Sequence, residues 1–261
     1  MAQHQVVSRD EWLKAREALL VHEKELTRAR DRLRAERLAL PCVKIDKTYV
    51  FDTPTGKKTL GDLFDGRSQL IVKHFMLAPG QGVGCVGCSF EVDQVEGALV
   101  HLEHHDVSYV AVARAPLDEI EAFKKRMGWR FRWVSSFGGD FNYDFNVSFT
   151  PEQIDKGDAF YNYRKGPVPM EDLSGRSVFF KDEAGDIFHT YSSFGRGGET
   201  GLTAYAYLDI APKGRNETGP SQDLSDWVRH HDKYDAGGHV DPQGRYHEAD
   251  EACCGHGTAA E

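Results

Sequence analysis

The stretch SQLIVKHFMLAPGQGVGCVGCSF, residues 68–90, joins an apolar run to a loop rich in glycine and cysteine. The run is typical of a strand buried in a parallel sheet, because its apolar residues do not alternate with polar ones. The loop carries two overlapping patterns. The pattern G-x-G-x-x-G is typical of a loop that binds the phosphates of a dinucleotide. The pattern C-x-x-C is typical of a redox dithiol or of half of a metal site. The residues that form them are Gly82, Gly84, Gly87, Cys85 and Cys88.

The segments after this loop predict a βαβ unit. We expect a helix from the loop to about His104, a buried strand at 106–113, and a second helix between Pro116 and Gly128. Proline at a helix start and glycine at its end fit that assignment. Strands and helices that alternate at this spacing indicate parallel strands with a right-handed crossover. A further strand, a β-hairpin turning at 183–186 and a last helix would complete an α/β domain.

Two details disfavour the dinucleotide interpretation. The first glycine of that fingerprint lies at the end of the strand, but LAPGQ separates Met76 from Gly82 here. The fingerprint also requires an acid at the end of the second strand, where this chain has Arg114. The cysteines are therefore the stronger signal.

The dithiol interpretation gains support from the expected helix. Cys88 begins an apolar stripe with residues four and three apart, which would pack on the sheet. Cys85 would lie one turn earlier at the helix N-terminus, where backbone N–H groups and the helix dipole lower a cysteine pKa to roughly 3.5–7.5. We therefore expect Cys85 to be the nucleophile and Cys88 the resolving thiol, with Gly84 and Gly87 lining the site. Gly87 would let another chain approach. Two structural thiols are the alternative.

Two other residues are candidates for lining the same site. His74 lies late in the strand before the loop and could tune a thiolate near Cys85, although a buried core histidine is the alternative. Trp133 belongs to an aromatic run at 129–145. Core packing is the favoured role for this run, and an aromatic wall over the thiol cleft is the alternative.

The first forty residues predict a helical arm. Ser8 and Glu11 form a capping box, and Pro41 ends the helix. Large apolar residues recur every seven positions and form one narrow stripe, not a full coiled-coil seam. We expect this arm, residues 1–40, to dock on the chain's own surface or on a second subunit in a homodimer. The stripe contains Trp12, Leu19, Leu26, Leu33 and Leu40.

The remaining chain divides into a globular domain at 41–211 and an irregular C-terminal extension at 212–261. We expect the extension to be disordered after 235, because periodicity disappears there. Its end contains possible zinc or copper ligands, but no standard ligand spacing. We predict no metal site and no cofactor, with an electron relay through the adjacent cysteines as a further alternative. The potential ligands are His239, His247, Cys253, Cys254 and His256.

Composition narrows the functional classes. A formal charge of -9 over 261 residues argues against nucleic acid as the main partner. No apolar run is long enough for a membrane helix, and the N-terminus lacks the features of a signal or transit peptide. Five cysteines do not form a secreted disulfide framework, so the expected location is cytoplasmic.

Three segments carry a resemblance to a known family. GCVGCSF at 84–90, the long motif at 114–145 and SVFFKDEAGDIFHTYSSFGRG at 177–197 are similar to domain-of-unknown-function family 899. The similarity runs from about residue 6 to 234. These bacterial proteins are thioredoxin-like and are labelled predicted dithiol-disulfide oxidoreductases. The resemblance implies a thioredoxin-like fold, in which a central mixed sheet carries the dithiol at the N-terminus of the first core helix.

One departure from thioredoxin-like enzymes affects the expected substrate. They usually place a cis-proline before the strand that faces the dithiol, where Arg176 and Ser177 stand here. These two residues are therefore expected to line the site, and a small disulfide or a peroxide becomes a plausible substrate beside a protein disulfide. The leading hypothesis is a thiol-disulfide oxidoreductase that uses a thiol electron donor. A thiol peroxidase and a non-catalytic metal- or partner-binding module are the alternatives.

Overall fold

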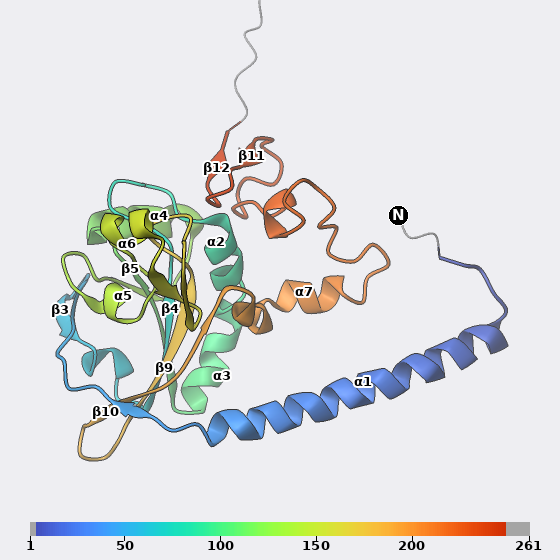
Figure 1. Cartoon of the computed structure of the whole chain (residues 1–261), viewed down its shortest axis with the longest axis horizontal. Coiled ribbons are helices and arrows are strands. Elements are labelled where there is room, and N and C mark those ends of the chain that lie inside the picture. Colours follow the sequence, from blue (N-terminus) through green and yellow to red (C-terminus); the bar gives the residue numbers. More distant parts are fainter. Residues whose placement is uncertain (1–3, 249–261) are drawn as a thin grey trace, which may run out of the picture.

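The computed structural model describes residues 4–248 of the chain. Its centre is an eight-stranded sheet with the strand order β1-β10-β9-β4-β5-β6-β2-β3 (Figure 1). The strands of this sheet are β1 (Val43–Lys44), β2 (Val50–Thr53), β3 (Gly56–Thr59), β4 (Gln69–His74), β5 (Val107–Ala113), β6 (Arg132–Ser135), β9 (Gly175–Lys181) and β10 (Ile187–Phe194). Two small hairpins lie outside it, β7 (Ala159–Tyr161) with β8 (Arg164–Gly166), and β11 (His239–Val240) with β12 (Tyr246–His247).

The α-helices are α1 (Arg9–Leu38), α2 (Val86–Asp93), α3 (Leu99–His104), α4 (Leu117–Met127), α5 (Phe141–Asp144), α6 (Pro151–Lys156) and α7 (Thr203–Leu208). Short 3-10 helices occur at η1 (Asp62–Phe64), η2 (Glu96–Ala98), η3 (Gly195–Gly201) and η4 (Leu224–Asp226). No helix within residues 4–248 is both long enough and apolar enough to cross a membrane.

The middle of the sheet has the expected thioredoxin-like arrangement. β4, β5 and β6 run parallel and are joined by helices, whereas β9 pairs with β4 antiparallel and β10 pairs with β9 antiparallel. A βαβ unit is thus followed by an antiparallel hairpin, with the dithiol at the start of the first helix. The predicted fold class is confirmed.

The two faces of this sheet have different cores. Because strand side chains alternate between faces, Leu70 and Val72 point to one face, where they pack with η1 and α5. Ala111 and Trp133 point to the other, where α2 and α4 cover them. The dithiol belongs to this second face, since Cys88 lies in the same apolar cluster. The aromatic run at 129–145 supplies both cores, which confirms core packing as its main role.

The helix expected to reach His104 is interrupted after Asp93. In a continuous helix the Gln94 N–H would donate to the Phe90 carbonyl. Here the Gln94 side-chain amide donates to that carbonyl at 2.7 Å, and its backbone N–H donates to Glu91 at 3.2 Å. The chain therefore tightens into η2 before α3 begins.

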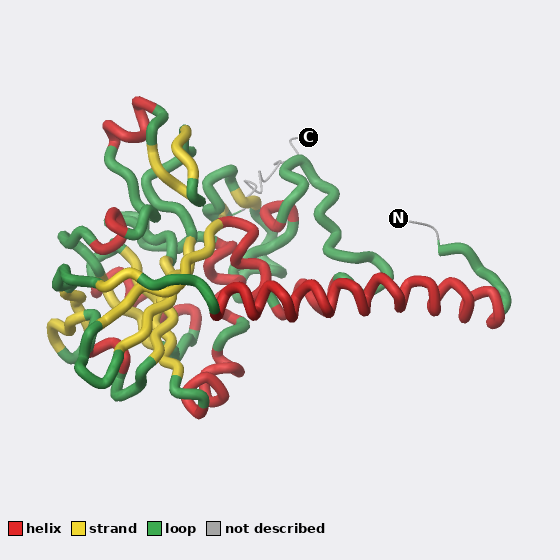
Figure 2. Tube along the Cα trace, turned by 60° about the horizontal axis from the view of Figure 1, so that its bottom comes forward, coloured by secondary structure: helices red, strands yellow, loops and turns green. Residues whose placement is uncertain are grey.

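Helix α1 projects away from the body (Figures 1 and 2). Its capping box at Ser8 and Glu11 is confirmed, but none of its 30 residues is buried. Contact with the body occurs near its end, where the Arg37 guanidinium lies 5.4 Å from the Tyr191 ring centroid. Within residues 4–248 the helix itself is thus not docked along the body, although Leu40, just beyond its end, lines a pocket with Phe179 and Phe180.

The C-terminal extension returns to the body. Val228 and His230 are fully buried, and Val228 packs in a cluster with Phe90 of α2. The sequence predicts disorder after residue 235, but residues up to 248 include the β11–β12 hairpin, which lies near the start of α2 (Figure 1). Residues 236–248 are therefore placed by contacts with distant residues, which periodicity does not report. Cys253, Cys254 and His256 lie outside the described residues.

Candidate functional site

The two cysteines lie where the sequence predicts, at the start of α2. Cys85 is the N-cap residue, and its N–H donates to the Met76 carbonyl at 3.2 Å. The Ser89 hydroxyl donates to the Cys85 carbonyl at 2.9 Å. Cys88 is one turn on and only 2% exposed, whereas Cys85 is partly exposed, and both thiols are free. An accessible thiol is thus followed by a shielded one.

The two thiols have opposite pKa shifts. Cys88 has its pKa lowered to about 6, first by its hydrogen bond with Cys85 and, against the effect of burial, by the charge of Lys73. The same hydrogen bond, followed by burial, raises the pKa of Cys85. The lowered pKa is expected at Cys85 from the sequence, whereas in the structure it falls on Cys88, the other member of the hydrogen-bonded pair. The hydrogen bond from Cys85 is the largest cause, and the charge of the buried Lys73 adds to it.

That cation belongs to a buried charge network. Lys73 is 1% exposed, and its Nζ lies 2.5 Å from a Glu91 oxygen and 2.6 Å from the Ser174 hydroxyl. The other Glu91 oxygen lies 2.5 Å from an Arg176 nitrogen. Burial alone would lower the pKa of Lys73 and raise that of Glu91, but their attraction outweighs it and keeps both charged. Lys73 therefore supplies a fixed positive charge to the thiols.

The C-terminal hairpin covers one side of Cys85. The Val86 N–H at the start of α2 donates to the Gly244 carbonyl at 2.9 Å. Gly244 has a φ of +77°, and a Cβ placed on it would lie 3.0 Å from the Cys85 sulfur. Only glycine fits this conformation and this gap.

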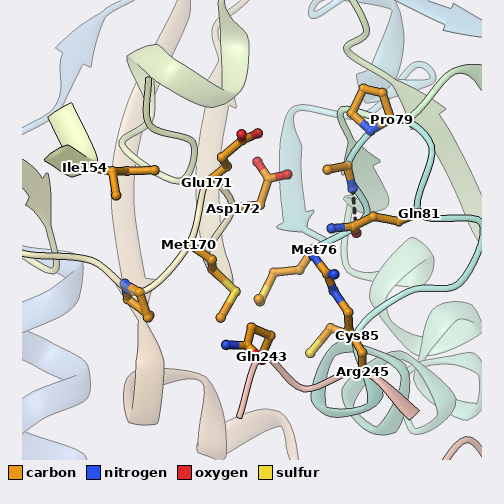
Figure 3. Close-up of a pocket in the computed structure, with 12 residues that line it drawn as sticks. Met76, Pro79, Gln81, Cys85, Ile154, Met170, Glu171, Asp172, Gln243 and Arg245 are labelled. Atoms are coloured by element: carbon orange, nitrogen blue, oxygen red, sulfur yellow. Dashed lines mark hydrogen bonds between the residues drawn. The ribbon is translucent and has the colours of Figure 1, made fainter. Parts of the chain in front are cut away.

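A cleft of about 500 Å³ opens on the other side of Cys85. One wall comes from the loop between β4 and α2, the opposite wall from residues 169–172, and one end from Gln243 and Arg245 of the hairpin. Figure 3 shows Met76 and Met170 reaching into the cleft from its two walls. This volume is within the range of small-molecule sites.

His74 and Ser177 do not line this site. The His74 ring is buried between Phe141 and Phe145, and its Nε2 is 2.8 Å from the Ser177 hydroxyl. Both residues face the sheet surface opposite α2. Burial lowers the pKa of His74 to about 3, so the ring is neutral at ordinary pH. The alternative of a buried core histidine describes it, because alternation along β4 turns it away from the dithiol.

The other predicted residues have mixed placements. Arg176 reaches the dithiol region through Glu91. Trp133 is in the core, 4.4 Å from Phe75 between ring centroids, and does not line the cleft of Cys85. A side chain on Gly84 would collide with Phe75.

Gly87 has a different neighbour from the one expected. A Cβ on it would lie 3.3 Å from Leu224, a residue of the same chain. The approach expected for another chain is thus occupied by the C-terminal extension.

Sequence reasoning missed Lys73, Glu91, Gly244 and Arg245. A signal for Lys73 existed, since a lysine inside an otherwise apolar strand requires a buried partner. Glu91 follows Cys88 by three residues and so shares its helix face. Nothing comparable identified Gly244 or Arg245, which reach the site through contacts with a distant part of the chain. Among residues 4–248, no cluster of three His, Cys, Asp or Glu side chains could hold a metal.

One known family matches most of the chain. The family described as "Bacterial protein of unknown function (DUF899)" matches residues 1–234. The chain belongs to this family. No curated protein matches the DUF899 chain.

Solved structures similar to this DUF899 protein are distant. A mutant of PrxQ from Xylella fastidiosa is 14% identical, covers 61% of this chain and 88% of its own, and gives a TM-score of 0.38. Peroxidoxin BcpB from Mycobacterium tuberculosis is 13% identical, with 65% and 97% covered and a TM-score of 0.39. A putative protein disulfide isomerase from Bacteroides thetaiotaomicron is 14% identical, with 64% and 88% covered and a TM-score of 0.38. These scores are too low to transfer an activity.

Proposed function

We propose that this DUF899 protein is a thiol-disulfide oxidoreductase with Cys85 as nucleophile and Cys88 as resolving thiol. The observation that carries the proposal is the buried Lys73 behind a C-x-x-C pair whose accessible member lines a cleft. A cation beside a thiol favours the thiolate, which is the reactive form. Two inert thiols need no such neighbour.

The proposed reaction uses the proton shared by the two thiols. Cys85 attacks one sulfur of a substrate disulfide while its proton passes to the Cys88 thiolate. The attack forms a mixed disulfide between Cys85 and the substrate and releases the first substrate thiolate. That thiolate takes the proton of Cys88. Cys88 then attacks the Cys85 sulfur, closes the Cys85–Cys88 disulfide and releases the second thiolate, which is protonated by solvent. The substrate disulfide is reduced to two thiols, and a thiol donor restores the dithiol.

Trapping experiments test this assignment. Alkylation at mildly acidic pH should label Cys85 first, because the pair shares one thiolate and Cys85 is its accessible member, whereas Cys88 is shielded and the remaining cysteines lack the cation. Oxidation should link Cys85 to Cys88. Cys88→Ser should accumulate mixed disulfides at Cys85 at a pH above the ordinary cysteine pKa of about 8.5, where Cys85 ionises without Cys88 as its base. Peptide mapping that finds Cys42 or Cys88 labelled ahead of Cys85, or no disulfide between the pair, would sink the proposal.

A thiol peroxidase is the second candidate, and the cleft favours it as well. A cavity of about 500 Å³ beside a partly exposed thiol admits small hydroperoxides. Cys85 would then form a sulfenic acid, with one oxygen transferred to sulfur and an alcohol released, and Cys88 would displace water to give the same disulfide. Cys88→Ser treated with cumene hydroperoxide should then yield a dimedone adduct at Cys85. An unmodified Cys85 would exclude this candidate.

We also propose that α1 pairs with α1 of a second copy. Its apolar stripe from Trp12 to Leu40 is between 43% and 52% exposed, and a helix of 30 residues gains most of its stability from such a face only when it is covered. Sedimentation should show a dimer for the wild type and for Thr27→Glu, which lies off the stripe. Leu26→Glu should be a monomer. A monomeric wild type would contradict the pairing.

The proposal keeps the cytoplasm as the expected compartment. Thiol donors there could reduce the Cys85–Cys88 disulfide after each turnover. Measuring the free thiols of the pair in protein taken rapidly from cells would check this expectation, and a fully oxidised pair would speak against it.

A further inference from the structure

The cleft beside Cys85 has an asymmetric charge distribution. Glu171 and Asp172 on one wall are paired with Arg114, whose nitrogens lie 2.7 and 2.9 Å from the Asp172 oxygens and 3.0 Å from a Glu171 oxygen. Asp172 also accepts a hydrogen bond of 2.5 Å from Ser148. Both acids of this wall thus pair with the same guanidinium.

Arg245 at the other end is not compensated in this way. Within residues 4–248, its guanidinium has no carboxylate within 4.0 Å and donates no hydrogen bond, although its backbone N–H donates to Asp241 at 2.8 Å. The backbone of the turn at 241–245 is thus fixed while the cationic group stays free. Arg245 and Cys85 both line the cleft (Figure 3). An arginine in this position presents two donors to an anion, and a carboxylate fits them well.

The rest of the lining is suited to a small organic molecule. Met76, Met170 and Ile154 give the cleft apolar surface. The Gln81 side-chain oxygen accepts from the Ala78 N–H at 2.9 Å, so its NH₂ group keeps its donors. Methionines are flexible and adapt to ligands of irregular shape.

The hairpin limits what else can reach Cys85. Gly244 stands against the Cys85 sulfur, and its carbonyl occupies the N–H of Val86. A folded protein substrate would have to displace this turn, whereas a small molecule can enter through the cleft. We propose, on the basis of the oxidoreductase function above, that the physiological substrates are small disulfides carrying a carboxylate, and that Arg245 binds the carboxylate.

The bonds, protons and electrons balance as in the oxidoreductase reaction given above. Each turnover breaks one disulfide bond in the small substrate, forms the Cys85–Cys88 disulfide and releases two thiols, and a thiol donor then supplies two electrons. Arg245 takes no part in proton or electron transfer. It is a specificity residue that positions the substrate.

Alkylation with two reagents of similar size tests the anion site without any turnover. Iodoacetate is an anion and iodoacetamide is neutral, so the ratio of their rates at Cys85 reports the local positive charge. Arg245→Gln should lower this ratio about fivefold, as expected for one exposed charge that lines the same cleft as the thiol. Arg245→Lys should retain most of the ratio, and Arg28→Gln on the distant arm should retain all of it. An unchanged ratio in Arg245→Gln overturns the proposal.

Turnover measurements separate this inference from the function on which it rests. The wild type should reduce dithiodipropionate, which carries carboxylates, at a kcat/KM about fivefold above that for neutral bis(2-hydroxyethyl) disulfide. Arg245→Gln should lose the preference through a higher KM for the anionic substrate. Equal rates for both substrates in the wild type would overturn the inference but leave the oxidoreductase standing. If neither disulfide is reduced, the oxidoreductase fails, and the alkylation ratio still decides the anion site.

Discussion

Lys73 and His74 are neighbours on β4 and equally buried, yet one is charged and the other neutral. Each is 1% exposed. Alternation along the strand turns Lys73 toward Glu91 and the dithiol, and His74 toward Phe141 and Phe145.

Burial disfavours the charged form of both side chains, but only Lys73 has a carboxylate to offset it. The difference teaches that a buried ionisable group keeps its charge only where a partner is built beside it. In this molecule that place is the face of the sheet that carries the cysteines.

The largest expected effects come from replacing one residue on each face of the sheet, since one face carries the thiol chemistry and the other only packs the core. Cys85→Ser should abolish thiol-dependent turnover and leave the melting temperature nearly unchanged, because it replaces one atom at a partly exposed site. His74→Gln should do the reverse, with turnover kept and stability lower by about 1–3 kcal/mol, because it disturbs a buried hydrogen bond to Ser177. Turnover and thermal unfolding of both variants check this. Normal turnover in Cys85→Ser would refute the assignment of the nucleophile.

Replacing the cation should produce a smaller effect on the same face. Lys73→Met removes the charge with an apolar side chain that is one atom shorter, and it leaves Glu91 paired with Arg176. The thiol pKa of about 6 should rise by about one unit, because an opposite charge nearby has been removed. The alkylation rate of the dithiol at pH 6 should then fall about fivefold. His74→Gln is the matched control and should keep the wild-type rate; an equal loss in both variants would mean that the two faces are not distinct.

The remaining expected effect is a pH dependence of stability that belongs to His74. Its pKa is about 3 in the folded protein and near 6.5 when unfolded, so the unfolded state binds more protons between these values. The free energy of unfolding should therefore fall as pH decreases through this window, by up to about 1.4 kcal/mol per pH unit. Urea titrations between pH 4 and 6 should give a shallower slope for His74→Gln. Identical slopes would show that His74 is not held neutral.

Much of the fold was accessible from the sequence because it depends on local patterns. The apolar run before the cysteines, the Pro116 and Gly128 boundaries and the capping box at Ser8 all report on adjacent residues, and each predicted the right element. The location of Cys85 at a helix start followed from the same reasoning.

The rest of the site depends on contacts that local patterns do not report. Alternation along the strand could have predicted that Lys73 and His74 point to opposite faces of the sheet. It was not applied, because β4 was interpreted as a continuous apolar run. Gly244 and Arg245 come from a segment without periodicity that is fixed by contacts with Val86 and Cys85. The proposed pairing of the apolar stripe on α1 involves a surface outside the single chain.

The central claim is that Lys73 makes Cys85 and Cys88 a reactive dithiol. A titration of the thiolate ultraviolet absorbance tests it most directly, with wild type, Lys73→Met and Cys88→Ser measured side by side. The account predicts that one thiolate per wild-type chain appears with an apparent pKa of about 6, and that this step moves to higher pH in Lys73→Met and disappears in Cys88→Ser. A wild type whose thiols all titrate near the ordinary cysteine value of about 8.5 would contradict the account.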